Sequence, residues 1–221
     1  MRNKSIAIDG PAGVGKSSVA FEIAKNLGFI HVDTGAIYRA LAIYILDRNI
    51  DFSNEKAVCA SLHFLKIELK FKNLLQSLII NGKEVTKIRS ENVSNAASLI
   101  SAFPCVRSFL LPVQHKIAET RDVVMDGRDI STVILPDANV KIFLTASLQE
   151  RAIRRFKQLR ETCIDCNYNE ILSSIEKRDK FDSTRKCAPL RISKDSIVYD
   201  TTGKSFENVV EYLLNEVRKV L

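Results

Sequence analysis

Residues 10–17 read Gly10-Pro-Ala-Gly-Val-Gly-Lys16-Ser17 and match the pattern G-x-x-x-x-G-K-[ST] in full. The run SIAID before them is typical of a buried strand, and residues 17–27 after them carry apolar side chains at helical spacing. Such a loop turns backbone N–H groups toward phosphate oxygens, and the helix that follows adds its positive end. The stretch therefore predicts a binding loop for a nucleoside triphosphate such as ATP.

The side chains of this loop have separate predicted roles. We expect Lys16 to reach the β- and γ-phosphates and Ser17 to hold a magnesium ion, Mg²⁺. The residues expected to bind the triphosphate are Gly10, Pro11, Ala12, Gly13, Val14, Gly15, Lys16, Ser17 and Ser18.

Length and charge limit the classes of protein that fit. A chain of 221 residues with 46% hydrophobic residues suits one medium domain with one or two small inserts. The formal net charge of +7 indicates anionic partners, either nucleic acid, an acidic membrane surface or phosphorylated small molecules. No signal-peptide pattern or membrane-spanning apolar run is visible, and five scattered cysteines suit free thiols. We therefore expect a cytoplasmic protein with no membrane partner.

Strands and helices alternate along most of the chain. Further buried strands are expected at residues 29–33, 122–126, 140–145 and 196–200, with helices between them and Thr34 as one helix N-cap. This order predicts an α/β fold with a five-stranded parallel sheet flanked by helices. Residues 66–86 instead alternate polar and apolar side chains around Asn81-Gly82, a hairpin signal, and predict an inserted small antiparallel sheet.

Arginines gather where the predicted parallel strands end. Ligands of parallel sheets bind beyond the carboxyl ends of the strands. Four of these ends lead into residues 10–17, 33–39, 126–129 and 145–155, and three of these segments carry arginine. A crevice lined with arginine favours a ligand with more than one phosphate group.

Six blocks of sequence, in order, resemble the bacterial-type cytidylate kinase family of nucleoside monophosphate kinases. They are GPAGVGKS at 10–17, DTGAIYR at 33–39, NAAS at 95–98 with FPCVR at 103–107, DGRD at 126–129, PDA at 136–138 with VKIFL at 140–144, and RDKFDSTR at 178–185 with APL at 188–190. The resemblance implies a P-loop kinase fold with an inserted acceptor domain and a short lid. It implies phosphoryl transfer from ATP to CMP or dCMP with Mg²⁺, giving ADP and CDP or dCDP.

The resemblance also implies a division of the chain. Residues 1–33, 122–150 and 168–221 would form the core, and residues 34–121 the nucleoside-monophosphate-binding region with its antiparallel insert at about 66–86. Residues 151–167 would form the lid, whose closure excludes water.

By the same resemblance the acceptor nucleotide has a defined set of contacts. Arg39, Arg128 and Arg185 would hold its phosphate, and Arg178 and Asp182 would approach the sugar. Ser98, Arg107 and Asp129 would contact the base, with Asp129 accepting from the N4 amino group of cytosine, so that CMP is preferred over UMP. The whole expected substrate set is Thr34, Tyr38, Arg39, Ser98, Arg107, Arg128, Asp129, Arg178, Asp182 and Arg185. The expected catalytic set is Lys16, Arg128, Arg154, Arg155 and Arg185.

Some features depart from the family pattern. Thr34 stands where serine is common, and Phe181 and Ser183 stand where some relatives have further arginines. A single Cys163-x-x-Cys166 pair is too little for a zinc site. The histidines are isolated in the sequence and have no partner pattern; they are His31, His63 and His115.

Two other functions stay open at this point. A kinase of the same architecture could take a different nucleoside monophosphate, and the positive charge could belong to a nucleic-acid-binding P-loop ATPase. The second reading lacks a recognition helix or aromatic stacking motif, and the arginines follow strand ends rather than one outer face. We therefore expect small nucleotides as partners, no nucleic acid, and a monomer.

Overall fold

The computed structural model describes residues 3–72, 74–86, 90–161 and 166–221. Its central sheet has five strands in the order β2-β6-β1-β7-β8, and every neighbouring pair is parallel. The strands are β1 (Ser5–Asp9), β2 (Ile30–Asp33), β6 (Val123–Gly127), β7 (Val140–Thr145) and β8 (Ile197–Asp200). The predicted α/β architecture is confirmed.

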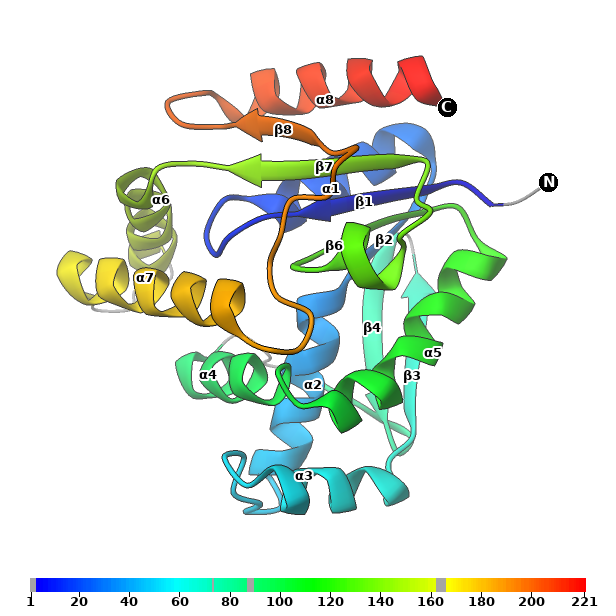
Figure 1. The fold of residues 1–221 in the computed structure, drawn as a ribbon, viewed down its shortest axis with the longest axis vertical. Helices are drawn as coiled ribbons and strands as arrows, with labels where there is room; N and C mark the ends of the chain where they lie inside the picture. Colours follow the sequence, from blue (N-terminus) through cyan, green and yellow to red (C-terminus); the bar gives the residue numbers. More distant parts are fainter. Residues whose placement is uncertain (1–2, 73, 87–89, 162–165) are drawn as a thin grey trace.

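Helices cover both faces of this sheet (Figure 1). The helices are α1 (Lys16–Leu27), α2 (Thr34–Leu46), α3 (Glu55–Ser61), α4 (Glu91–Ile100), α5 (Pro104–Thr120), α6 (Leu148–Glu161), α7 (Tyr168–Thr184) and α8 (Phe206–Val220). Short turns of other helix types lie at η1 (Leu62–Phe64) and η2 (Ile130–Ile134). Asn54 caps α3, and the chain tightens into η1 after Ser61.

Successive side chains of β1 point to opposite faces of the sheet, so they belong to two different apolar clusters. Ile6 and Ile8 of β1 pack with α1 and α8, whereas Ala7 packs with α2, α4 and α5 on the other face. Both isoleucines are fully buried, and each stabilises the fold by roughly 2–3 kcal/mol. Because β1 is fixed from both faces, its end holds the glycine-rich loop in a constant place.

The inserted sheet is antiparallel, in the order β3-β4-β5 (Ile67–Lys72, Leu75–Ile80 and Lys83–Glu84), as predicted. Asn81 and Gly82 have φ of 48° and 81°, as a two-residue hairpin turn requires. Ile67, Leu78 and Ile80 join the same apolar cluster as α2. The insert is thus packed against α2, in the lower half of Figure 1.

Two cysteines and one helix cap differ from expectation. Cys59 and Cys105 form a disulfide between α3 and α5, where free thiols were expected. The sulfur atoms meet because both helices border the same cluster, which no local pattern encodes. The N-cap of α2 is Asp33, whose carboxylate accepts from the amide of Ala36, and Thr34 is the first residue of the helix.

The described part of the chain holds no single helix long and apolar enough to cross a membrane. The helical stretches Asn92–Ile100 and Pro104–Thr120 meet the length and composition criteria only together, and they are bent by 95°.

Candidate active site

The glycine-rich loop between β1 and α1 needs glycine for steric reasons. Gly10, Gly13 and Gly15 have φ of 151°, 74° and 93°. A Cβ atom on Gly10 would lie 2.2 Å from the carbonyl oxygen of Leu144. Positive φ at these three positions lets the loop turn its amides to one side and make a concavity for anions. The loop can therefore cradle a triphosphate, as its sequence predicts.

Lys16 lies in this loop as a buried cation, with 6% of its surface exposed. Its Nζ donates to the carbonyl oxygen of Pro11 over 2.6 Å. Burial, followed by repulsion from Arg128, holds the pKa of Lys16 well below its usual range. An anionic ligand beside Nζ would reverse that effect, so Lys16 is suited to bind phosphate.

Ser17 faces a carboxylate on the neighbouring strand β6. Its Oγ donates to Asp126 Oδ2 over 2.7 Å, and His31 Nε2 lies 2.7 Å from Asp126 Oδ1. Thr34 Oγ1 donates to the Asp126 carbonyl oxygen over 2.7 Å. Burial raises the pKa of Asp126, but the contacts with His31 and Ser17 outweigh it, and the net pKa is lowered.

This group of oxygen atoms fits Mg²⁺. A hydroxyl and an ionised carboxylate side by side are hard oxygen donors, and Mg²⁺ binds through one or two such groups and its waters. The Ser17 prediction is therefore compatible with the structure. The sequence analysis missed His31, because its contact with Asp126 depends on β2 lying beside β6.

Arginines from three parts of the chain meet beside Lys16. Arg39 lies on α2, Arg128 directly follows β6, and Arg178 lies on α7. Burial, and then repulsion from Arg128 and Arg39, lowers the pKa of Arg178 to about 10. The buried Nε atoms of Arg39 and Arg178 have no hydrogen-bond partner within the described residues. The group therefore gathers several positive charges and keeps two free donors, as a phosphate site requires.

Asp182 on α7 organises the arginines around it. Arg128 Nε donates to Asp182 Oδ2 over 2.9 Å, and Arg185 Nη1 lies 3.8 Å from Asp182 Oδ1. Arg185 is further fixed by Nε and Nη2 donating to the carbonyl oxygen of Ala188. The structure thus brings Arg39, Arg128, Arg178, Asp182 and Arg185 to one place, although they span 146 positions of sequence between Arg39 and Arg185.

The residues expected to read the base form a second buried group. Arg107 Nη2 donates to Asp129 Oδ2, and Arg185 Nη2 lies 3.7 Å from Asp129 Oδ1. Burial raises the pKa of Asp129 to about 6, and the charges of Arg107 and Arg185 oppose this rise. The ring of Tyr38 lies 5.9 Å from the guanidinium carbon of Arg107, and burial raises the Tyr38 pKa to about 12.

Ser101 was missed by the sequence analysis, whereas Ser98 was named. Ser101 Oγ accepts from Arg185 Nη1 over 2.8 Å, and its carbonyl oxygen accepts from Arg107 Nη1 over 3.3 Å. Its hydroxyl also donates to the Ser98 carbonyl oxygen over 2.7 Å. Ser101 therefore joins the two arginines, while the role of the Ser98 side chain stays a prediction.

Asp9 is a second missed residue and is fully buried at the end of β1. Its carboxylate accepts from the amides of Ile130 and Ser131 over 2.8 Å each, and from Ser131 Oγ over 2.5 Å. Burial raises the pKa of Asp9. These bonds fix the chain directly after Asp129. The position at a strand end was a signal that could have found it.

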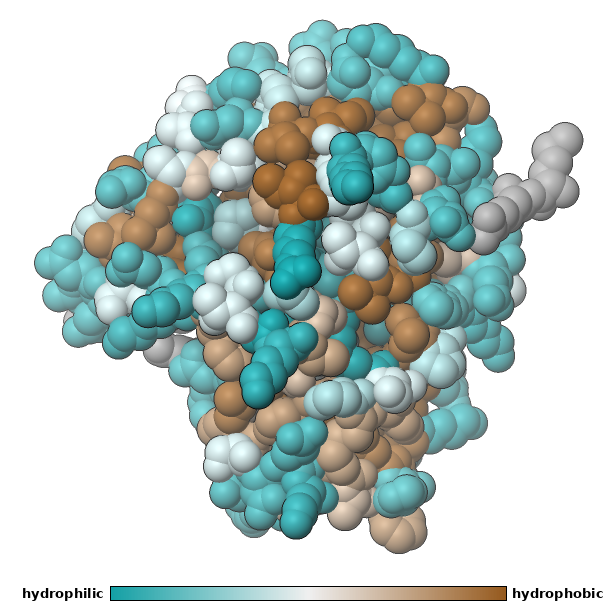
Figure 2. All heavy atoms as spheres, in the orientation of Figure 1, coloured by the Kyte–Doolittle hydropathy of each residue, from teal (hydrophilic) through white to brown (hydrophobic). Residues whose placement is uncertain are grey.

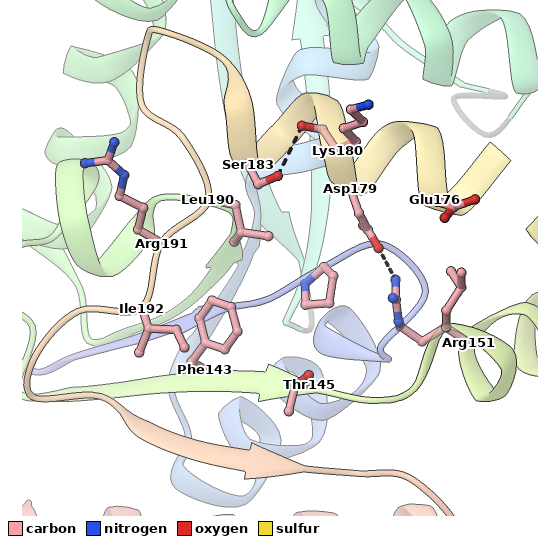
Figure 3. Close-up of a pocket in the computed structure, with 12 residues that line it drawn as sticks. Phe143, Thr145, Arg151, Glu176, Asp179, Lys180, Ser183, Leu190, Arg191 and Ile192 are labelled. Atoms are coloured by element: carbon pink, nitrogen blue, oxygen red, sulfur yellow. Dashed lines mark hydrogen bonds and ion pairs between the residues drawn. The ribbon is translucent and has the colours of Figure 1, made fainter. Parts of the chain in front are cut away.

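Helices α6 and α7 brace the outer side of the phosphate loop. Arg151 Nη1 donates to the Ala12 carbonyl oxygen over 3.0 Å and pairs with Asp179 Oδ2, whose other oxygen accepts from the Ala12 amide over 2.9 Å. Figure 3 shows Arg151 and Asp179 pointing toward each other from the two helices. Arg151 therefore holds the loop from behind, and this role is distinct from contact with a phosphate.

A cavity of about 570 Å³ lies beside this brace. Pro11 borders it, together with Phe143 of β7 and Leu190 and Ile192 from the segment after α7 (Figure 3). It flanks the loop and is lined by none of the residues expected to bind the acceptor.

Arg154 and Arg155, also on α6, make different contacts. Arg154 donates through Nη2 to the Thr201 carbonyl oxygen over 2.7 Å and through Nη1 to the Val14 carbonyl oxygen over 3.4 Å, so it lies beside the loop. Arg155 donates to Gln158 Oε1 on its own helix over 2.7 Å. Their contact with donor phosphates stays a prediction. Residues 162–165 of the expected lid, Cys163 among them, lie outside the described residues.

Comparisons with known proteins identify the family of this chain. The family model described as "Cytidylate kinase" matches residues 6–219. A cytidylate kinase of Caldicellulosiruptor bescii is 44% identical over 100% of this chain and 98% of its own length. One from Caldanaerobacter subterraneus subsp. tengcongensis is 46% identical over 97% and 94%, and one from Fusobacterium nucleatum 39% over 100% of both.

Solved structures at low identity support the fold alone. A gluconokinase from Sinorhizobium meliloti 1021 has a TM-score of 0.50 at 14% identity, covering 99% of this chain and 93% of the other. An uncharacterized protein from Eubacterium ventriosum has a TM-score of 0.53 at 12% identity, covering 98% and 99%. The family match over nearly the whole chain and its close relatives lead to one conclusion: this chain belongs to the cytidylate kinase family of enzymes.

Proposed function

We propose that this kinase transfers the γ-phosphoryl group of ATP to the phosphate of CMP or dCMP, giving ADP and CDP or dCDP, with Mg²⁺ bound at the donor phosphates. The observation that carries this proposal is the cluster of four arginines beside Lys16, in which Arg185 is buried and Arg39, Arg128 and Arg178 are half-buried. The Nε atoms of Arg39 and Arg178 have no hydrogen-bond partner within the described residues. Two phosphate-bearing ligands facing each other would neutralise the charge on both sides of that crevice.

The chain's own residues would act mainly by binding and orienting. The loop amides and Lys16 would hold the β- and γ-phosphates of ATP, while Arg39, Arg128 and Arg185 would hold the acceptor phosphate in line with them. Ser17, with Asp126 behind it, would hold Mg²⁺. When bound, Mg²⁺ neutralises charge on the transferring phosphoryl group.

Base selection would depend on the buried pair of Arg107 and Asp129. The Asp129 carboxylate would accept from the cytosine N4 amino group, and Arg107 would donate to the O2 and N3 acceptors. Uracil would turn a carbonyl oxygen toward the same carboxylate, which is unfavourable. The sugar would lie near Arg178 and Asp182.

Residues 151–167 would close as a lid that excludes water, and Arg154 or Arg155 would then touch the donor phosphates. The protein is proposed to act as a monomer, and the cytoplasm is the proposed compartment.

The proposal is tested by following ADP release from ATP and Mg²⁺ with CMP, dCMP, UMP, AMP and GMP in parallel. We expect turnover mainly with CMP and dCMP. Arg39→Ala should lose most of it, whereas Arg48→Ala should not, because Arg48 stacks on Tyr44 at 3.8 Å, further along the same helix axis. Equal turnover of all five acceptors would overturn the base assignment, and no turnover with any would overturn the reaction.

A further inference from the structure

Gln76 on β4 connects the inserted sheet to the end of β2, beside the proposed acceptor site. Gln76 Oε1 accepts from the backbone amide of Asp33 over 3.0 Å, and Nε2 donates to the Asp33 carbonyl oxygen over 3.2 Å. Asp33 ends β2, which is the edge strand of the main sheet. The carboxamide therefore takes the place that a neighbouring strand would occupy at this edge.

Asp33 in turn connects to the phosphate-binding group. Its Oδ1 accepts from the amide of Ala36 over 2.8 Å and caps α2, and its Oδ2 accepts from Arg39 Nη2 over 2.9 Å. The packing here is tight, because a Cβ atom on Gly35 would lie 3.0 Å from Arg39 Nη1 and 3.1 Å from Asp33 Oδ1. The position of the Arg39 guanidinium thus depends on the backbone of Asp33.

Arg39 is held from one side only. Its Nη2 is bound by Asp33, while its buried Nε has no partner within the described residues. A guanidinium fixed at one edge presents its remaining donors in a defined direction. Any rotation of the Asp33 backbone would move those donors relative to Lys16 and the loop.

We propose that Gln76 is a positioning residue for the acceptor phosphate: it locks the backbone of Asp33, and through the Asp33 carboxylate it sets the direction of Arg39. The antiparallel insert thereby takes part in acceptor binding without touching the nucleotide. This inference rests on the proposed function, because it needs a nucleoside monophosphate as acceptor.

The test uses the full chain with Gln76→Met, which keeps the length of the side chain and removes both hydrogen bonds. We expect the KM for CMP to rise roughly 3- to 10-fold, the effect of losing one or two neutral hydrogen bonds, with the KM for ATP unchanged. Ser77→Ala is the matched control on the same strand and should leave both values as in the wild type. Inhibition by cytidine, which lacks the phosphate, should be unchanged in Gln76→Met.

An unchanged KM for CMP in an active Gln76→Met enzyme overturns the inference. An equal rise in the KM for ATP or in the inhibition constant of cytidine also overturns it, because such a rise indicates a general loss of order in the site. If Gln76→Met does not fold, Gln76→Glu keeps the acceptor for the Asp33 amide and loses the donor. A wild-type KM for CMP in that variant overturns the inference. A wild-type enzyme with no activity toward CMP refutes the proposed function instead.

Discussion

The proposed preference for CMP over UMP should weaken as the pH falls, because Asp129 becomes protonated. The pKa of this buried carboxyl is raised to about 6 because burial outweighs the attraction of Arg107 and Arg185. At about pH 7.5 nearly all molecules carry the carboxylate, and at about pH 5 roughly one in ten does. In the proposed site the ionised group would accept from the N4 amino group of cytosine, whereas the protonated group would donate to the O4 of uracil.

The magnitude follows from that titration and from the strength of the bond. A hydrogen bond to a charged group contributes about 1.5–3 kcal/mol, or roughly 10- to 150-fold in kcat/KM. The ratio of kcat/KM for CMP to that for UMP should therefore fall at least about tenfold between pH 7.5 and pH 5. The ratio is the quantity to measure, because both substrates carry a phosphate that also titrates near pH 6, and this shared effect cancels.

Asp129→Asn provides the control, since it keeps the shape and cannot ionise. Its ratio should be low and independent of pH, with the KM for ATP as in the wild type. A wild-type ratio that stays constant from about pH 5 to about pH 8 would refute the assignment of Asp129 as the residue that reads the base. A pH-dependent ratio that persists in Asp129→Asn would assign the effect to another group.

Three further substitutions test residues that support the site. His31→Phe should lower the free energy of unfolding in urea by about 2 kcal/mol, because Asp126 loses a buried partner 2.7 Å away; a loss below about 0.5 kcal/mol would contradict this. Arg151→Met should raise the KM for ATP several-fold and leave the KM for CMP unchanged in steady-state assays, because only the loop at Ala12 loses its brace; equal changes in both would argue against that role. Gly10→Ala should cost more than about 3 kcal/mol or prevent folding, since the new Cβ would lie 2.2 Å from a β7 carbonyl oxygen; near-normal thermal stability would refute it.

Much of the fold could be predicted because its signals are local. The phosphate loop needs glycine where φ is positive, and the Asn81-Gly82 turn needs two such positions in a row. The cap of α2 was assigned one residue late. Thr34 has a capping side chain, but its hydroxyl bonds to the carbonyl oxygen of Asp126 on another strand, and Asp33 takes the cap.

Contacts between distant segments could not be predicted in the same way. The sequence offers His31 as an isolated histidine, and only the order β2-β6 brings it to Asp126. Cys59 and Cys105 are 46 positions apart and meet because α3 and α5 cover one cluster.

The sequence alone determined that this chain has a glycine-rich phosphate-binding loop, an alternating α/β core and an inserted hairpin. The period of the hydrophobic residues and the positions of the glycines are local signals. Each depends on a few residues of sequence and can be interpreted without knowing which segments lie beside them in the fold. The tertiary structure decided that Gln76 binds the backbone of Asp33, that Asp9 fixes the chain after Asp129, and that Arg151 braces the loop. These contacts depend on which strands adjoin and which helix faces pack together, and burial then makes each unpaired polar group costly enough to require its partner.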